Sequence, residues 1–334
     1  MLPIDILSVG NATIDVFLTI DEKNPHVKLD EKTNELRFGH GEKIEVKKYD
    51  LSIGGNAANV AVGISRLSLK SGLIAEIGND EFSQKIINSL KNEKVDIELV
   101  RQIESEASSL SVGINFKTDR TLFIEHVKRE HNFEFDKKQT NAIFLTSLGP
   151  VWEEAYEKTL NFVRENNIRL FFNPGTLQIE KRSTLIWKII SQTEVLFLNK
   201  EEAEEILYGK EIKLPSDSKT YIKKMLYGLK SLGVKIAVIT DGRNGSYLMD
   251  DKHNTYHLEA AKCEIIERTG AGDAYNSGFI SAMLNKEPYM EAMRWGGFNA
   301  SSVIGAIGAQ KGLLTKEEMF KKIKDENEYS PKEI

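Results

Sequence analysis

The hydrophobic positions of the chain form short continuous runs that alternate with longer amphipathic stretches. A short apolar run is the pattern of a strand buried on both faces of a parallel sheet. Such runs predict strands at Ile4–Val9, Leu73–Ile77, Ala142–Thr146, Ile168–Phe172, Val195–Leu198 and Val234–Thr240. The stretches between them predict helices at Asn56–Leu67, Glu81–Asn92, Trp152–Asn166, Glu201–Tyr208 and Ser218–Leu232. This alternation favours an α/β fold, with a mostly parallel sheet covered by helices on both faces.

Residues 12–51 and 97–130 interrupt this alternation because they offer strands but no long helix. Their apolar runs predict strands at Ile14–Ile20, Ile44–Leu51, Ser111–Phe116 and Thr121–Val127. The residues between the last two runs, Lys117–Arg120, are typical of a hairpin turn. We expect both segments to form one small β-sheet lid over a cleft. The α/β core that binds nucleotide and substrate would then comprise residues 1–11, 52–96 and 131–334.

The most informative polar motif is the Gly-Ala-Gly-Asp sequence at Gly270–Asp273. A strand-like run at Cys263–Glu267 precedes it, and a helix-like run at Ala274–Leu284 follows. The small residues allow backbone N–H groups to approach an anion closely, and the ionised Asp273 could accept a proton from a hydroxyl. An anion cradle beside a base is what phosphoryl transfer to a hydroxyl requires. A glycine turn with Asp273 as a helix cap would explain the same four residues.

Two common phosphate-binding motifs do not fit this chain. The dinucleotide fingerprint needs a third glycine three positions after the second. In this chain the second glycine is Gly272, and the position of the third is occupied by Tyr275. The P-loop needs a glycine five residues before a Gly-Lys pair. The pair Gly209-Lys210 has Glu204 at that position. The sequence therefore supports neither a nicotinamide enzyme nor a P-loop NTPase.

Two motifs near the N-terminus suit a polyhydroxyl substrate. Asp15 interrupts an apolar strand, which is costly unless the carboxylate has a partner such as vicinal sugar hydroxyls. The pair Gly54-Gly55 opens a helix whose first turn carries Asn56 and Asn59, and their amides can both donate and accept hydrogen bonds. A solvent-facing edge position for Asp15 and a helix cap at Asn56 are the alternative interpretations.

Two further motifs directly follow predicted strands, where ligands bind in open α/β sheets. In the first, Asn199–Glu202, the carboxylate of Glu202 could orient water around Mg²⁺. An asparagine helix cap followed by acidic residues is the alternative. In the second, Thr240–Gly245, the threonine and glycines could line a nucleotide and Arg243 could reach a phosphate, or the segment could be a plain hairpin turn.

Composition and charge narrow the possible partners and location. The chain has 334 residues, a net charge of −5 and a pI of about 5.8, so we expect no binding to nucleic acid or anionic membranes. Cys263 is its single cysteine, which excludes an internal disulfide and fits the cytoplasm. The N-terminus lacks the basic region of a signal peptide. The longest apolar run, Trp295–Ala309, is too short to span a membrane and predicts a buried helix.

Taken in order, these motifs resemble those of the ribokinase family, also called phosphofructokinase-B-type carbohydrate kinases. The matching segments are Gly10–Asp15, Gly54–Asn59, Leu73–Phe82, Asn199–Glu202, Thr240–Gly245 and Gly270–Asp273. Asn299 and residues 308–310 are similar to the family's final nucleotide and cation segment. The resemblance extends from about residue 4 to residue 312.

The resemblance implies a Rossmann-like α/β core with a β-lid, and ATP-dependent phosphorylation of a sugar or nucleoside hydroxyl. Asp273 would be the base, with the anion hole at Gly270, Ala271 and Gly272. Substrate would be held by Asn11, Asp15, Gly54, Gly55, Asn56 and Asn59. ATP would be bound by Asn199, Thr240, Gly242, Gly245 and Asn299. Glu202 would serve Mg²⁺, and many members also bind K⁺ near the position of Glu267.

The sequence also departs from the family's usual pattern. Glu267 stands where aspartate is usual, and Arg268 replaces a typical threonine or proline. We expect Arg268 to contact ATP phosphates.

The sequence leaves the substrate open among several possibilities. We expect a sugar kinase of the ribokinase or fructokinase type acting on a primary hydroxyl. A nucleoside kinase would require an aromatic platform, for which Phe123, Phe133 and Phe135 are the candidates. A phosphosugar kinase would use Lys128 and Arg129 to bind the existing phosphate. A non-catalytic sugar-binding protein of the same fold is the remaining alternative. An exposed lid edge could also pair two copies into a homodimer.

Overall fold

The computed structural model describes residues 3–117, 119–125, 127–135, 139–212 and 220–334. Within these residues, ten strands form the main sheet in the order β16-β15-β14-β13-β12-β11-β10-β1-β6-β7. Its parallel part comprises β1 (Ile6–Val9), β6 (Ser71–Gly78), β7 (Val100–Ile103), β10 (Ala142–Thr146), β11 (Arg169–Asn173), β12 (Val195–Asn199) and β13 (Ile236–Thr240). Antiparallel strands β14 (Ser246–Met249), β15 (Thr255–Leu258) and β16 (Lys332–Glu333) extend one edge.

Helices cover both faces of this sheet, because successive residues of each buried strand point to opposite sides. One face packs against α3 (Glu153–Glu165), α4 (Thr176–Glu180), α5 (Thr184–Ile190), α6 (Lys200–Gly209) and α7 (Tyr221–Ser231). The other face packs against α1 (Asn56–Arg66), α8 (Ala271–Leu284), α9 (Tyr289–Val303) and α10 (Lys316–Asp325). A further helix, α2 (Glu81–Asn92), packs with α1 on β6.

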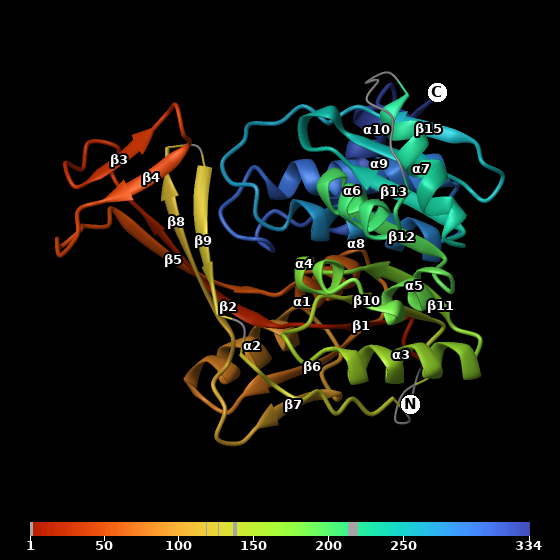
Figure 1. Cartoon of the computed structure of the whole chain (residues 1–334), viewed down its shortest axis with the longest axis horizontal. Helices are drawn as coiled ribbons and strands as arrows, with labels where there is room; N and C mark the ends of the chain where they lie inside the picture. Colours follow the sequence, from red (N-terminus) through yellow and green to blue (C-terminus); the bar gives the residue numbers. More distant parts are fainter. Residues whose placement is uncertain (1–2, 118, 126, 136–138, 213–219) are drawn as a thin grey trace.

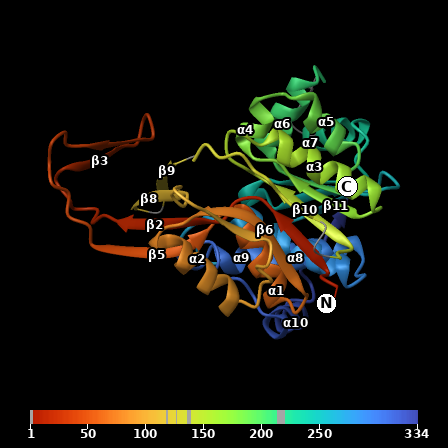
Figure 2. The same cartoon turned by 90° about the horizontal axis from the view of Figure 1, so that it is seen from below.

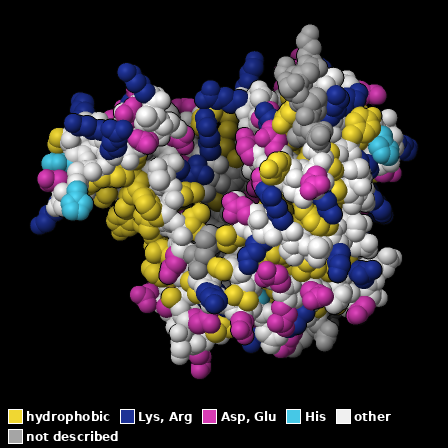
Figure 3. All heavy atoms as spheres, viewed as in Figure 1, with side chains coloured by type: hydrophobic (Ala, Val, Ile, Leu, Met, Phe, Trp, Pro, Cys, Tyr) yellow, Lys and Arg dark blue, Asp and Glu magenta, His cyan; other side chains and the backbone are white. Residues whose placement is uncertain are grey.

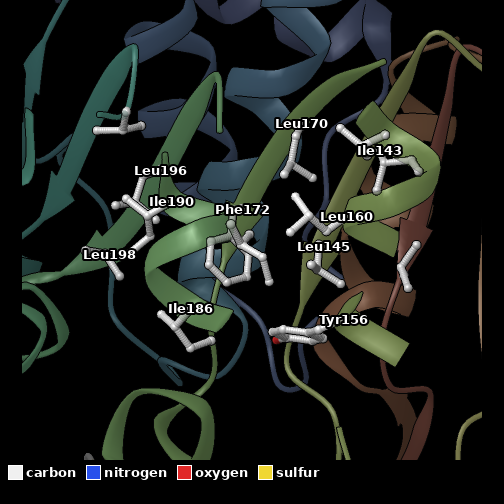
Figure 4. Packing of buried hydrophobic residues seen from close by; sticks show 14 of the residues in the cluster. Ile143, Leu145, Tyr156, Leu160, Leu170, Phe172, Ile186, Ile190, Leu196 and Leu198 are labelled. Carbon is white, nitrogen blue, oxygen red and sulfur yellow. The ribbon is translucent and has the colours of Figure 1, made fainter. Parts of the chain in front are cut away.

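The buried face beneath α3 and α5 illustrates how the core is filled. Leu145, Leu170 and Phe172 from neighbouring strands meet Tyr156 of α3 and Ile186 of α5 (Figure 4). All five side chains are at most 1% exposed. Tyr156 donates its hydroxyl hydrogen to the Thr146 carbonyl at 3.0 Å, so its one polar group is satisfied inside the core. Burial of whole aliphatic and aromatic side chains stabilises the sheet on which the site is built.

A second, four-stranded sheet forms the lid, in the order β5-β2-β8-β9. Its strands are β2 (Thr13–Thr19), β5 (Lys48–Gly54), β8 (Leu110–Phe116) and β9 (Asp119–Ile124). A small hairpin of β3 (Val27–Asp30) and β4 (Glu35–Phe38) packs on it through Ile20, Val27 and Phe116. The lid projects from one side of the core, with the β3–β4 hairpin at its outer end (Figures 1 and 2).

The fold class expected from the sequence, an α/β core with a β-lid, is confirmed. The predicted core strands are all present, with bounds that differ by at most two residues. The predicted helix at Ser218–Leu232 corresponds to α7, although its first two residues lie outside the described part of the chain, as does Thr118 of the expected hairpin turn. None of the helices in the described segments has the length and apolar character needed to cross a membrane.

The strand predicted at Cys263–Glu267 is wrong. This segment is extended but pairs with no strand in the described residues, and the N–H groups of Ile266 and Glu267 donate instead to the Ile304 carbonyl. Two of its apolar residues, Cys263 and Ile265, line a cavity rather than a sheet face, which accounts for part of the strand-like pattern. The lid sheet also differs from the expected lid segments, residues 12–51 and 97–130, at two places. Strand β5 continues beyond residue 51 to Gly54, and β7 lies within the second segment but belongs to the main sheet.

Candidate active site

The carboxyl ends of the parallel strands open into a cavity of about 560 Å³, and lid strands β2, β8 and β9 contribute to its lining. The surface is visibly hollowed between lid and core (Figure 3). Ligand sites of open α/β sheets lie at this edge. Polar residues from several elements line the cavity, among them Asn11, Asp15, Asn56, Asn59, Ser111, Ser147, Asn173, Asn199, Glu202, Asp273 and Asn276. The structure thus brings together motifs that are widely separated in the sequence.

Asp273 lies on the first turn of α8, which begins after Gly270. Gly270 has a φ of 76°, and a Cβ there would lie 2.4 Å from the Cβ of Ala309, so the turn requires glycine. The Asp273 side chain does not cap the helix. Its Oδ2 accepts a hydrogen bond from Asn59 Nδ2 at 2.8 Å, and Asn59 Oδ1 accepts from Gln310 Nε2 at 2.9 Å. Two amides in series therefore hold the carboxylate in place.

The environment of Asp273 raises the pKa of its carboxyl group well above that of a solvent-exposed aspartate. Burial raises the pKa of this carboxyl to about 7, and the hydrogen bond from Asn59 opposes that rise. The nearby charges of Asp15 and Glu202 raise the pKa further. A carboxylate with a pKa near neutrality is suited to accept a proton at physiological pH.

Asp15 lies on β2 and points into the same cavity. Its Oδ1 accepts hydrogen bonds from Ser111 Oγ at 2.6 Å and from Thr13 Oγ1 at 3.2 Å. Burial raises the pKa of Asp15, while both hydroxyl hydrogen bonds lower it. The solvent-facing edge position is excluded, because Asp15 is 7% exposed.

The two glycines before α1 have different structural roles. Gly54 does not line the cavity, and a Cβ at this position would lie 2.0 Å from Asp15 Oδ2. It therefore provides space for the Asp15 carboxylate rather than contacting a ligand itself. Gly55, with a φ of 90°, does line the cavity beside Asn56 and Asn59.

Asn199 and Glu202 form a capping box at the start of α6. Asn199 Oδ1 accepts from the Glu202 N–H at 2.8 Å, and Glu202 Oε2 accepts from the Asn199 N–H at 2.9 Å. The helix-cap interpretation is therefore correct, and Asn199 uses its amide oxygen within the protein. Both residues nevertheless line the cavity, and burial raises the pKa of Glu202 to about 7.

The donor set around Glu202 fits a magnesium ion that arrives with phosphates. No cluster of three or more histidine, cysteine or acidic residues that could hold a metal exists among the described residues. Magnesium usually keeps several waters and needs one or two carboxylates besides substrate phosphates. Glu202, facing the cavity, would hold such a water.

A second cavity, of about 480 Å³, lies on the other side of the α8 N-terminus. Its walls include Thr240, Gly242, Arg243, Gly245, Ala261, Ile265, Tyr275, Ala300 and Ser301. Gly245 has a φ of 85°, and a Cβ there would lie 2.0 Å from the Leu258 carbonyl oxygen. Thr240, Arg268, Ala271 and Gly272 line both cavities. The two cavities therefore meet at the glycine-rich turn.

Asn299 does not take the position that the resemblance implied. Its side chain is fully buried, and its Nδ2 donates to the Ala274 carbonyl at 3.0 Å and to Ser277 Oγ at 2.9 Å. Its Oδ1 accepts from the Leu314 N–H at 2.9 Å. It lines neither cavity, so the expected contact with ATP is corrected to a structural role between α8 and α9.

Glu267 is surrounded by donors. Its Oε1 accepts from the Thr269 N–H at 2.9 Å and from the Thr269 hydroxyl, and its Oε2 accepts from the Gly308 N–H at 2.7 Å. Arg120 Nε lies 3.4 Å from Oε1. These neighbours do not fit the K⁺ site expected at Glu267, because three donors already bond to the carboxylate and the positive charge of a guanidinium lies beside it.

Sequence reasoning missed several residues of this site. Asn276 lies one turn after Asp273, and its Nδ2 donates to Asn173 Oδ1 at 3.0 Å, so helical spacing from Asp273 could have identified it. Gln310 and Arg120 gave no local signal, because their partners are distant in the sequence. Arg129, in contrast, was considered from the sequence as a residue that binds a substrate phosphate. It lines the first cavity, but each nitrogen of its side chain donates to Glu106 or to a backbone carbonyl.

The α/β core, the β-lid and two cavities that meet at a glycine-rich helix start define a class of small-molecule kinases. The model of the pfkB family of carbohydrate kinases matches residues 17–316. The chain therefore belongs to the pfkB carbohydrate kinase family, and it is an ATP-dependent carbohydrate kinase.

Similar proteins within this family act on several substrates. The chain is 24% identical to a ribokinase from Haemophilus influenzae, with 83% of this chain and 89% of the relative covered. It is also 24% identical to a 5-dehydro-2-deoxygluconokinase from Geobacillus thermodenitrificans, with 95% and 92% covered. The solved structure of a nucleoside kinase from Methanocaldococcus jannaschii, described as an archaeal member of the ribokinase family, shares the fold with a TM-score of 0.76. That match is 23% identical and covers 97% of this chain and 99% of that one.

Proposed function

We propose that the protein phosphorylates a hydroxyl of an unphosphorylated sugar, with Asp273 as the general base. The observation that supports this most is the meeting of the two cavities at Gly270–Asp273. The acceptor would occupy the first cavity, with its hydroxyls bound by Asp15, Asn11 and the amides on the first turn of α1. The nucleotide would occupy the second cavity, with its phosphates passing Arg268.

The residues at this junction have complementary roles in the transfer. The Asp273 carboxylate accepts the proton of the attacking hydroxyl, which typically contributes about 10²–10⁴ in rate. The oxygen then attacks the terminal phosphorus, whose bond to the nucleotide's bridging oxygen breaks. The N–H groups of Ala271 and Gly272, at the positive end of α8, stabilise the charge on the phosphoryl oxygens. Bound Mg²⁺ would neutralise part of that charge, with a water held by Glu202.

The cavity walls favour a sugar over the other candidate substrates. Of the three phenylalanines considered for a nucleoside platform, Phe123 is on the outer side of the lid and Phe133 and Phe135 are buried in the core. Among the described residues that line the first cavity, Phe197 and His131 carry the rings. For a phosphosugar, Arg129 would have to break its three existing contacts, and the exposed Lys128 does not line the cavity.

A coupled assay of ADP release tests this proposal across pentoses, hexoses, keto-sugar acids, phosphosugars and nucleosides. We expect turnover with an unphosphorylated sugar or sugar acid, and a loss of about 10² or more in the Asp273→Ala variant. Nucleotide binding by that variant, measured by calorimetry, should persist, because Asp273 lies on the acceptor side. Equal turnover in the variant would exclude Asp273 as the base. Turnover with nucleosides alone would show that the substrate is a nucleoside and not a sugar.

The location proposed for this activity is the cytoplasm. The donor, ATP, is abundant there, and the single cysteine needs no oxidising compartment. Fractionation of the source cells with an antibody against the chain tests this assignment.

A further inference from the structure

Arg120 brings a positive charge from the lid to the loop that precedes α8. Arg120 lies on β9, where it pairs with Asn115 of β8. Asn115 is four residues from Ser111 along β8, and Ser111 pairs with Asp15 of β2. Because every second residue of a strand points to the same side, Arg120 and Asp15 share one face of the lid. The Nε of Arg120 lies 3.4 Å from Glu267 Oε1. The side chain of Arg120 is 19% exposed and that of Glu267 is 5% exposed, so water screens this ion pair weakly.

Glu267 in turn holds two loops beside the anion hole. Its bonds to Thr269 fix the residue before Gly270, and its bond to the Gly308 N–H fixes the residue before Ala309. Ala309 and Gly270 pack so closely that a Cβ on Gly270 would not fit. The carboxylate therefore sets the path of the backbone into α8, where Ala271 and Gly272 present their N–H groups.

The site contains an excess of buried negative charge near the ion pair. Asp15, Glu267 and Asp273 are all less than 9% exposed, and the incoming nucleotide adds further negative charge. The charge of Glu267 raises the pKa of Asp15, and the charge of Arg120 lowers it, which indicates that the guanidinium acts on both carboxylates. A buried carboxylate needs such a partner, and removing it is costly.

We propose that Arg120 takes the place of a monovalent cation at Glu267, so that the positioned lid itself completes the anion hole. The guanidinium neutralises Glu267 and keeps the turn at residues 267–270 in the form that binds phosphate. Arg120 is thus a positioning residue, and the enzyme needs no K⁺. This inference rests on the proposed function for its catalytic consequence, but the ion pair can be tested without turnover.

The first experiment compares ADP release in potassium chloride and in tetramethylammonium chloride at equal ionic strength. Wild-type turnover should be the same in both salts. In Arg120→Gln we expect kcat to fall about tenfold or more in tetramethylammonium, because a misplaced catalytic turn slows the reaction. In K⁺ we expect kcat of the same variant to recover. Acceptor KM should change less than kcat. The double variant Arg120→Gln/Glu267→Gln should show no response to K⁺.

The matched control is Lys117→Gln, in the same hairpin. Lys117 pairs with the exposed Glu31 at 3.1 Å and faces the surface, so this variant should behave as wild type in both salts. Arg120→Lys keeps the charge and should remain independent of K⁺, which provides a second test if Arg120→Gln does not fold.

Thermal unfolding in the same two salts gives a readout that needs no catalysis. K⁺ should raise the Tm of Arg120→Gln relative to tetramethylammonium, and should leave wild type and Lys117→Gln unchanged. Severalfold activation of wild type by K⁺, or an Arg120→Gln variant indistinguishable from Lys117→Gln, would overturn the inference. Absence of ADP release by wild type with every acceptor would instead contradict the proposed function, while the unfolding comparison would still decide the role of Arg120.

Discussion

At the scale of single residues, the protonation of Asp273 decides when the proposed reaction can proceed. The pKa of about 7 results mainly from burial, with Asp15 and Glu202 adding to it and Asn59 opposing it. The functional carboxylate is therefore not a typical surface aspartate, which would be ionised well below neutral pH. Its poised state depends on neighbours contributed by the lid and by α6.

We predict that kcat/KM for the acceptor rises about tenfold per pH unit below pH 7 and becomes constant above it. The reason is that only the ionised Asp273 can accept the hydroxyl proton. Glu202→Gln removes a neighbouring negative charge, so it should move the inflection to lower pH. The measurement is a pH–rate profile of both proteins at subsaturating acceptor. A flat profile down to pH 5 in wild type would contradict Asp273 as the titrating base.

Gly54→Ala should raise the acceptor KM about tenfold while leaving the ATP KM unchanged. The new Cβ would lie 2.0 Å from Asp15 Oδ2 and would displace that carboxylate, and a lost hydrogen bond to a charged group costs about 1.5–3 kcal/mol. Steady-state kinetics with each substrate varied in turn provides the measurement. Gly209→Ala, where a Cβ would make ordinary contacts at 3.5 Å, serves as the control. An unchanged acceptor KM would show that Asp15 does not bind the acceptor.

At the scale of elements, the starts of α1, α6 and α8 supply much of the site. Each helix follows a strand of the lid or core and presents polar side chains or N–H groups from its first turn. The capping box of α6 has a close counterpart in α10, where Thr315 and Glu318 make the same reciprocal bonds but line neither of the two cavities described above. Comparing variants of the two capping boxes therefore distinguishes the contribution of a helix cap to stability from its contribution to catalysis.

Asn199→Ala and Thr315→Ala should each lower the free energy of unfolding by about 1 kcal/mol, since each removes one helix cap. Only the Asn199 variant should lower kcat, because its cap also positions Glu202 beside the cavity. Urea denaturation and ADP release measure the two effects. Equal loss of turnover in both variants would mean that Asn199 matters for stability alone.

At the scale of the whole molecule, the lid has two different faces. Alternation along the strands places Asp15 and Arg120 toward the cleft, and Tyr49, Leu51 and Phe123 on the opposite face. These three side chains are 69%, 41% and 56% exposed, and apolar side chains gather over the lid in Figure 3. Neighbouring exposed apolar side chains are a feature of interaction surfaces.

We predict that this outer face of the lid pairs with a second copy of the chain in solution. A twofold arrangement would cover Tyr49, Leu51 and Phe123 on both copies. Sedimentation velocity should show a dimer for wild type and a monomer for Leu51→Glu/Phe123→Glu. Tyr208→Glu, which places a charge on a similarly exposed ring at the core surface, is the control and should remain dimeric. A monomeric wild type at micromolar concentration would refute the prediction.

The sequence by itself determined the elements and much of the site. Apolar runs, amphipathic periods and helix-start motifs are local signals, so the core strands and residues such as Asp15, Asn59 and Asp273 could be identified from their neighbours along the chain. The apolar segment at Cys263–Glu267 misled this reasoning, because a cavity wall and a buried strand select the same residue types.

The tertiary structure decided which motifs meet, because contacts between distant segments leave no local pattern. Asn59 and Asp273 are 214 positions apart, and Asn59 and Gln310 are 251 apart, yet together they set the state of the proposed base. The inward direction of Asn299, the use of Gly54 as space for Asp15 and the pairing of Arg120 with Glu267 also follow from packing. Periodicity specifies which face of an element is apolar, but the partner of a buried polar group depends on how the elements pack.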